Sequence, residues 1–273
     1  MAPENERKSE GPSPPSLSKA ADAETDGRPA RKLRHLAGKA IHGFDLISEG
    51  DRIAVGVSGG KDSLLLSVFL ADLKRRAPVS FELGAIHLGP DGEGKLAQWL
   101  GGLGLDFIHI EDPPEVPEIA LWRPGGPSPC FNCSRARRSR LFSICRDLGA
   151  NRLALGHHLD DAIETLLMNI MHSGRVEGLR CRQDLFEGRL SIIRPLFLVP
   201  EALVIKLVEN WSLPAAPKSC PADGHTVRQE IKEMVSELTI RHPKVYGNLM
   251  AAVSSLAASN QDVKDNEKNI QNH

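Results

Sequence analysis

The residues best suited to chemistry lie at positions 58–63, which read Ser-Gly-Gly-Lys-Asp-Ser. They follow a short apolar run at 53–57, typical of a buried strand, and precede an apolar run at 64–73 with helical spacing. Glycines let backbone N–H groups close around an anion, a helix N-terminus adds positive potential, and Lys61 adds a full charge. The pattern therefore predicts a phosphate-binding loop. The alternative, a strand–helix turn without a ligand, leaves the Lys-Asp-Ser run unexplained.

Two adjacent carboxylates form a second candidate group. The stretch 156–161 reads Gly-His-His-Leu-Asp-Asp and follows a predicted strand at 152–155. Carboxylates at the end of a strand, facing a phosphate loop across a parallel sheet, suit Mg²⁺, which prefers one or two carboxylates together with phosphate oxygens. The other interpretation is that Asp160 and Asp161 only cap a helix. The neighbouring loop at 58–63 favours the magnesium site.

Three of the five cysteines form a candidate metal site. Cys130 and Cys133 have the C-x-x-C spacing of paired metal ligands, and Cys220 lies on a proline-flanked loop much farther along the chain. Three thiolates hold either zinc with one further ligand or a [4Fe–4S] cluster with one iron left open. The residues alone leave both open. Cys145 falls on the apolar side of a predicted helix, which indicates a small core residue.

Composition limits the class of protein. The 273-residue chain has a formal net charge of −1, so any basic binding surface must be local. No apolar run approaches the ~20 residues of a membrane helix, and the N-terminus lacks the apolar core of a signal peptide. A chain of this kind with few cysteines is typical of a reducing compartment, and we expect a cytoplasmic protein that does not bind membranes.

The spacing of strands and helices predicts the fold that must position these groups. Helical patterns separate five predicted strands, at 53–57, 81–88, 106–110, 152–155 and 190–194. This alternation predicts a Rossmann-like parallel five-stranded sheet in the α/β class, with helices on both faces. Ligands then bind at the carboxyl ends of the strands. His87, at the end of the second strand, would lie beside them or in the core.

Three segments are expected along the chain. Residues 1–28 are rich in Pro, Ser, Glu and Asp and have few large apolar residues, which predicts a disordered tail. A single domain spans 29–258 and ends in helices near the C-terminus. Residues 259–273 are polar and are expected to form a flexible tail.

Several motifs together resemble a known family. The loop at 58–63 lacks the Gly and Ser/Thr positions of a mononucleotide P-loop but resembles the pyrophosphate loop of the N-type ATP pyrophosphatases. The chain is similar to the tRNA 2-thiocytidine synthetase (TtcA-like) branch of that superfamily. The matching stretches run in family order from about residue 31 to 258: Gly38-Lys-Ala-Ile41, Gly50-Asp-Arg52, the 58–63 loop, Cys-x-x-Cys-Ser-Arg at 130–135, Gly-His-His-x-Asp-Asp at 156–161, Ile193-Arg-Pro-Leu196 and Arg228-Gln229.

The resemblance implies an ATP-dependent tRNA sulfurtransferase. The C2 oxygen of an anticodon-loop cytidine attacks the α-phosphate of ATP, and sulfur from a three-cysteine [4Fe–4S] cluster or a persulfide then displaces AMP. The implied ligands of ATP and Mg²⁺ are Ser58, Gly59, Gly60, Lys61, Asp62, Ser63, Gly156, Asp160 and Asp161. The implied cluster ligands are Cys130, Cys133 and Cys220, although Lys218 and Ser219 separate Cys220 from the proline that a family cysteine follows directly. The implied catalytic residues are Lys61, Asp62, Asp161, Cys130 and Cys220.

The resemblance also implies partners. Four arginines after the cysteine pair would hold tRNA phosphates, unless they form an ordinary solvated helix face; they are Arg135, Arg137, Arg138 and Arg140. A cysteine desulfurase or another donor would supply sulfur, and homodimers are common in the family. Three alternatives remain: an adenylating ligase of the lysidine-synthase or amide-forming type, a cluster-dependent sulfur enzyme acting on a small molecule, and a non-catalytic protein that binds ATP and metal.

Overall fold

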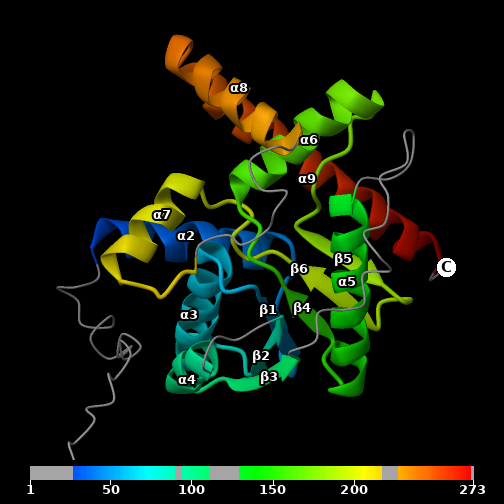
Figure 1. The fold of residues 1–273 in the computed structure, drawn as a ribbon. Coiled ribbons are helices and arrows are strands. Elements are labelled where there is room, and N and C mark those ends of the chain that lie inside the picture. Colours follow the sequence, from blue (N-terminus) through cyan, green and yellow to red (C-terminus); the bar gives the residue numbers. More distant parts are fainter. Residues whose placement is uncertain (1–26, 90–93, 111–128, 217–226, 272–273) are drawn as a thin grey trace, which may run out of the picture.

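A six-stranded sheet forms the centre of the computed structural model, which describes residues 27–89, 94–110, 129–216 and 227–271 (Figure 1). The strand order is β3-β2-β1-β4-β6-β5. Every pairing is parallel except that of β5 with β6. The strands are β1 (Arg52–Val57), β2 (Glu82–Leu88), β3 (Asp106–Ile110), β4 (Arg152–Ala154), β5 (Arg182–Leu185) and β6 (Leu190–Ile193).

The α/β class and all five predicted parallel strands are confirmed, and the structure adds a sixth strand that pairs antiparallel at one edge of the sheet. The additional strand, β5, reads Arg-Gln-Asp-Leu and shows no buried apolar run. It joins the sheet as an antiparallel edge next to β6. An edge strand reached by a hairpin needs few apolar residues, so its polar sequence resembles a loop.

Helices cover both faces of the sheet, as predicted. Along β1, Ile53, Val55 and Val57 face one side and join the larger core cluster, whereas Ala54 faces the other side and joins a smaller cluster under α5. Figure 1 shows α5 on one side of the sheet and α2, α3, α4 and α7 on the other. The helices are α2 (Arg28–Gly43), α3 (Lys61–Arg76), α4 (Lys95–Gly102), α5 (Pro129–Asp147), α6 (Leu159–Ser173), α7 (Glu201–Asn210), α8 (Val227–Arg241) and α9 (Lys244–Gln271).

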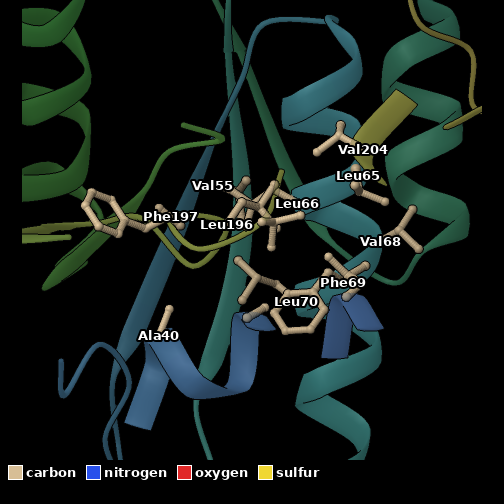
Figure 2. Packing of buried hydrophobic residues seen from close by; sticks show 14 of the residues in the cluster. Ala40, Val55, Leu65, Leu66, Val68, Phe69, Leu70, Leu196, Phe197 and Val204 are labelled. Atoms are coloured by element: carbon tan, nitrogen blue, oxygen red, sulfur yellow. The ribbon is translucent and has the colours of Figure 1, made fainter. Parts of the chain in front are cut away.

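Helix α3 is the centre of the larger cluster. Every residue from Ser63 to Ala71 is buried, so this helix is enclosed on all sides in its first half. Figure 2 shows Leu66 and Leu70 of α3 next to Val55 of β1, with Leu196 and Phe197 from the segment after β6. This packing fixes the start of α3, and with it the loop at 58–63.

The strand order reverses between β1 and β4. From β1 the chain proceeds outward through β2 to β3, and it then returns to place β4 on the other side of β1. The carboxyl ends of β1 and β4 are therefore adjacent, and the crevice at such a reversal is the usual ligand site of an open α/β sheet. The predicted phosphate loop follows β1, and the predicted carboxylates follow β4.

The described helices begin close to the expected start of the domain and extend past its expected end. The predicted disordered tail lies outside the described residues up to position 26, and α2 begins at Arg28. Helix α9 continues to Gln271, past the predicted domain end at 258. No helix in the described ranges is long and apolar enough to cross a membrane.

Truncation of Leu66 to Ala should destabilise the fold. The side chain is fully buried, and removal of a buried leucine side chain lowers the free energy of unfolding by about 2–5 kcal/mol. Urea unfolding followed by circular dichroism measures this loss. Ile205→Ala, at a more exposed position on α7, is the matched control and should change the same quantity by less than about 0.5 kcal/mol. Equal effects of the two substitutions would contradict the packing described here.

Candidate functional site

Serine hydroxyls hold the loop at 58–63 in a defined shape. Gly59 has φ +79°, a conformation that glycine adopts without strain. The Ser63 hydroxyl donates to the Gly60 carbonyl at 2.9 Å and accepts the Ser58 N–H at 3.2 Å. The Ser58 hydroxyl accepts the Gly60 N–H at 3.3 Å. Helix α3 begins at Lys61, within the same loop, so the helix N-terminus and the loop together offer the backbone N–H groups that suit an anion.

Gly156 brings the second group against this loop. A Cβ atom at Gly156 would lie 2.9 Å from the backbone carbon of Asp62 and 3.0 Å from the nitrogen of Ser63. Contacts that short with backbone atoms are not tolerated, so only glycine permits this approach. The predicted meeting of the two segments across the β1–β4 boundary is therefore confirmed.

Lys61 lies among carboxylates. Its Nζ is 3.0 Å from Asp62 Oδ1 and 3.1 Å from Glu201 Oε1, at the start of α7. Burial would lower the pKa of Lys61, but Asp62 and Glu201 raise it above its ordinary value. The other oxygen of Glu201 is 2.6 Å from Nζ of Lys232 on α8. Although burial opposes it, hydrogen bonds from the two lysines lower the pKa of Glu201 to about 2.

A buried imidazole separates Asp62 from Asp161. His158 Nε2 is 3.7 Å from Asp62 Oδ1 and 3.4 Å from Asp161 Oδ2. The backbone N–H of His158 donates to Asp161 Oδ2 at 2.9 Å. Arg228 donates to the other oxygen of Asp161 at 2.8 Å. Burial would raise the pKa of Asp161, but the neighbouring histidines, this N–H and Arg228 hold it below its ordinary value. Asp161 is therefore ionised at neutral pH.

Asp160 has a different environment from Asp161. Its Oδ2 accepts the Glu201 N–H at 2.7 Å, and the Tyr246 hydroxyl of α9 donates to both of its oxygens at 3.1 Å. This carboxylate thus connects the starts of α6 and α7 to α9. The two adjacent aspartates, which the sequence treats alike, serve different parts of the structure.

Further titratable groups lie beside this network. Burial and the adjacent Arg194 lower the pKa of His157 to about 4, so its neutral ring accepts the Arg194 Nε–H at 3.2 Å. Burial raises the pKa of Glu164 to about 7, although Arg228 Nη1 lies 3.4 Å from this carboxylate. His87 is buried too, with Nδ1 2.8 Å from the Val57 carbonyl, so it is a core residue of the sheet.

The predicted metal ligands come from two segments of the chain, the start of α5 and the segment before α8. Cys130 and Cys133 belong to the first turn of α5, but their side chains, and the whole of Cys220, lie outside the described part of the chain. Described residues on both sides of Cys220 contact the site: the Ala216 N–H donates to the Gly59 carbonyl at 3.0 Å, and the Arg228 side chain donates to Asp161 at 2.8 Å. Among the described residues, no group of three His, Cys, Asp or Glu side chains is arranged to hold a metal ion.

The other cysteines are core residues. Cys145 is fully buried, and burial raises the pKa of its thiol to about 12, which confirms the predicted core position. Cys181 is also buried, and its thiol lies 3.7 Å from the Arg194 carbonyl. Neither thiol is poised for reaction at neutral pH.

The four predicted RNA-binding arginines are exposed on the N-terminal half of α5. Arg137 Nη2 lies 4.0 Å from the place a Cβ would occupy at Gly89, directly after β2. Arg138 is close enough to Arg194 to lower its pKa, after the larger effect of burial. Two of these side chains thus lie near the carboxyl edge of the sheet, and the other two, Arg135 and Arg140, are simply exposed.

Sequence reasoning missed several residues of the network. Glu201 pairs with both Lys61 and Lys232, which lie far from it in the sequence. No local sequence pattern identifies Glu201 or Lys232 as part of the site. Glu164 carried a detectable signal, because it stands one helical turn after Asp161 in the same helix. Arg228 belongs to a stretch that resembles the family, but its contact with Asp161 depends on how α8 packs on α6.

Comparison with known proteins agrees with this geometry. The family model described as the PP-loop domain matches residues 132–238. The chain is 38% identical to the tRNA-cytidine(32) 2-sulfurtransferase of Pelobacter propionicus, over 83% of this chain and 86% of the relative. It is 39% identical to the protein of the same name from Syntrophotalea carbinolica, over 83% of this chain and 89% of the relative.

A solved structure shows the same fold. The U34-tRNA thiolase NcsA from Methanococcus maripaludis, determined with its [4Fe–4S] cluster, superposes with a TM-score of 0.66. The match is 24% identical in sequence and covers 84% of this chain and 77% of that one.

Replacement of Glu201 by Gln tests the buried charge network. The folded pKa of about 2 lies below the unfolded value of about 4.3, so the ionised carboxylate stabilises the fold above the unfolded pKa, and this stabilisation is lost as the pH falls toward 2. We expect Glu201→Gln to lower the free energy of unfolding by about 2 kcal/mol at pH 7, and by progressively less below pH ~5.

Urea unfolding at several pH values measures this effect. The control is Glu209→Gln, at an exposed position of the same helix, which should change the free energy of unfolding by less than about 0.5 kcal/mol. A Glu201→Gln loss that stays constant from pH 7 to 3 would show that the charge does not stabilise the fold.

Proposed function

This chain belongs to the tRNA-cytidine(32) 2-sulfurtransferase family of PP-loop proteins, and we propose that it replaces the C2 oxygen of an anticodon-loop cytidine with sulfur at the expense of ATP. The relatives' names place that cytidine at position 32. One structural observation carries the proposal: the loop at 58–63, Asp161 and both ends of the segment with Cys220 meet at the β1–β4 boundary.

The loop at 58–63 is the proposed site of the ATP phosphates. Backbone N–H groups at the start of α3 and the Lys61 ammonium would stabilise the negative charge that develops on pyrophosphate as the cytidine oxygen attacks the α-phosphate. The ion pairs of Lys61 with Asp62 and Glu201 hold its ammonium beside the loop before the nucleotide arrives. The attack breaks the bond between the α- and β-phosphates, so the C2 oxygen then leaves with AMP.

Magnesium is proposed to bind with ATP at the carboxylates of Asp62 and Asp161, on either side of the His158 ring. Asp62 Oδ1 is buried and accepts no hydrogen bond from the described residues, although the Lys61 ammonium pairs with it at 3.0 Å, and Asp161 is held ionised nearby. Such carboxylates, together with phosphate oxygens, fit the preference of Mg²⁺. Asp160 and Asp161 both accept hydrogen bonds, Asp160 from Tyr246 and the Glu201 N–H and Asp161 from Arg228 and the His158 backbone N–H. A metal ion at either carboxylate would replace one of these donors, and both remain proposed ligands. A divalent cation would also offset the repulsion between these carboxylates and ATP.

Three cysteines are proposed to hold a [4Fe–4S] cluster. Cys130 and Cys133 are one helical turn apart at the start of α5, and the described residues Ala216 and Arg228, which precede and follow Cys220 in the chain, contact Gly59 and Asp161. Three thiolates suit a cluster that keeps one iron position open. When bound, the cluster would supply or hold the sulfur that displaces AMP. A separate donor, such as a cysteine desulfurase, would replenish that sulfur.

The arginines of α5 are proposed to bind the tRNA. All four are exposed, and Arg137 lies near the carboxyl edge of the sheet. Guanidinium groups suit phosphates because they donate two parallel hydrogen bonds. An unpaired anticodon-loop base fits this chemistry, since its edge can be turned into a pocket.

Gly156→Ala should disturb the nucleotide site. The added methyl group would meet backbone atoms of Asp62 and Ser63, so the loop must move. We expect the Kd for ATP, measured by calorimetry, to rise at least about tenfold, or about 1.4 kcal/mol. Gly38→Ala is the control, because a Cβ there meets open space. Unchanged ATP affinity in Gly156→Ala would contradict the proposed position of the phosphates.

Anaerobic reconstitution with iron and sulfide tests the reaction itself. We expect about four irons per chain and a broad absorbance near ~400 nm in the unmutated protein, and loss of both in Cys220→Ala. The same protein should form 2-thiocytidine in tRNA, detected by mass spectrometry of its nucleosides, with one AMP released per thiolation. Cys145→Ala is the control, because Cys145 is a buried core residue.

The alternatives give different results in the same assay. AMP formation with zinc alone and no thiolation would favour an adenylating ligase. A loaded cluster with no product in tRNA would favour a small-molecule substrate. No AMP under any condition would favour a non-catalytic binding protein.

A further inference from the structure

A groove of about 570 Å³ lies between the C-terminal half of α5 and the tip of the β5–β6 hairpin. Its size is within the range of pockets that bind small ligands. Phe142 and Arg146 of α5 and Phe186 and Arg189 of the hairpin line it, together with Asn151 before β4. It lies at the start of β4, whereas the ATP site lies at the carboxyl end of that strand, and no function discussed above uses it.

Phe186 occupies a position that does not favour a large side chain. It has φ +53° and Glu187 has φ +59°, at the centre of a turn closed by the Gly188 N–H donating to the Leu185 carbonyl at 3.1 Å. Turns with two positive φ values favour Asn and Gly. Phe186 is also 55% exposed, so burial does not compensate for the strained backbone. The fold alone gives no reason for an aromatic residue here.

The groove combines aromatic and cationic groups. The rings of Phe142 and Phe186 meet edge to face with centroids 5.9 Å apart. Arg146 is 76% exposed, and its hydrogen bonds to described residues are those to Asp147 and Ser143, both at the surface. Arg189 Nε donates to the Phe186 carbonyl. Surface ion pairs of this kind are weak and exchange easily for a ligand anion. Ring faces and guanidinium groups together match a nucleotide, which offers a base and a phosphate.

One face of α5 joins the groove to the candidate RNA-binding arginines. Residues at successive spacings of three or four, namely 135, 138, 142 and 146, share this face. It extends over about 16 Å from Arg135 to Arg146. An RNA strand that contacts Arg135 and Arg138 near the cysteine pair would therefore reach the groove by following a single helix.

We propose that this groove binds an unpaired nucleotide of the tRNA, other than the cytidine that is modified. Its base stacks against Phe186 and Phe142, and its phosphate pairs with Arg146 and Arg189. This inference rests on the proposed function, because tRNA must be the substrate. The groove would then hold the RNA at a second point and fix its register relative to the ATP site.

Phe186→Asn tests the proposal without disturbing the turn, because Asn adopts positive φ readily. We expect the Kd for full-length tRNA, measured by fluorescence anisotropy, to rise about five- to a hundredfold, whereas the urea midpoint of unfolding stays equal or increases. Arg146→Gln should weaken tRNA binding. It should also reduce the slope of log Kd against log salt by about 1, the amount expected for the loss of one phosphate contact. Ile205→Asn on α7, across the sheet from α5, is the matched control (Figure 1).

The outcomes separate this inference from the proposed function. Unmutated protein that binds no tRNA would overturn both. Unmutated protein that binds and thiolates tRNA, with Phe186→Asn and Arg146→Gln both equal to it in affinity, would overturn the groove alone. A third outcome concerns free AMP, measured in a Lys61→Ala background. If Phe186→Asn abolishes AMP binding there but leaves tRNA affinity unchanged, the groove is a site for free nucleotides and the tRNA assignment is overturned.

Discussion

The close approach of Gly156 to the backbone of Asp62 and Ser63 is the contact on which the candidate site depends. With no side chain between them, the segments after β1 and β4 touch, and the phosphate loop meets the His-Asp-Asp group. The buried residues 63–71 of α3 fix the helix that follows the loop, and the parallel pairing of β1 with β4 sets the position of the loop. A single methyl group at this contact would push the two halves of the site apart, because it would meet backbone atoms of Asp62 and Ser63.

Opposite charges then give this contact its chemistry. Lys61, Glu201 and Lys232 form a chain of ion pairs, while Arg228 and His158 surround Asp161. An adjacent opposite charge favours the ionised form of a group, so these residues support one another's ionisation. The same pairs attach α7 and α8 to the phosphate loop. The ion pairs that set the charge of the site therefore also hold α7 and α8 in position.

The α5 helix carries the features that a nucleic-acid substrate requires. It begins with the cysteine pair, continues with exposed arginines, and ends beside the groove of Phe142 and Phe186. Its apolar residues, such as Leu141 and Cys145, pack on the sheet beside the smaller core cluster. One face therefore anchors the helix, and the remainder is available for a long polyanion, which explains how a chain with almost no net charge can still present a basic surface.

The sequence by itself determined the α/β class, the five parallel strands, the strand, loop and helix at 53–73 and the place of the His-Asp-Asp group, because these depend on short-range periodicity and on glycine and charge at fixed spacing. Only the tertiary structure decided the polar edge strand β5, the separate environments of Asp160 and Asp161, and the roles of Glu201, Lys232 and Arg228. Each of these arises from contacts between segments far apart in the chain. Such contacts leave no local pattern, since they depend on how complete helices and strands pack together.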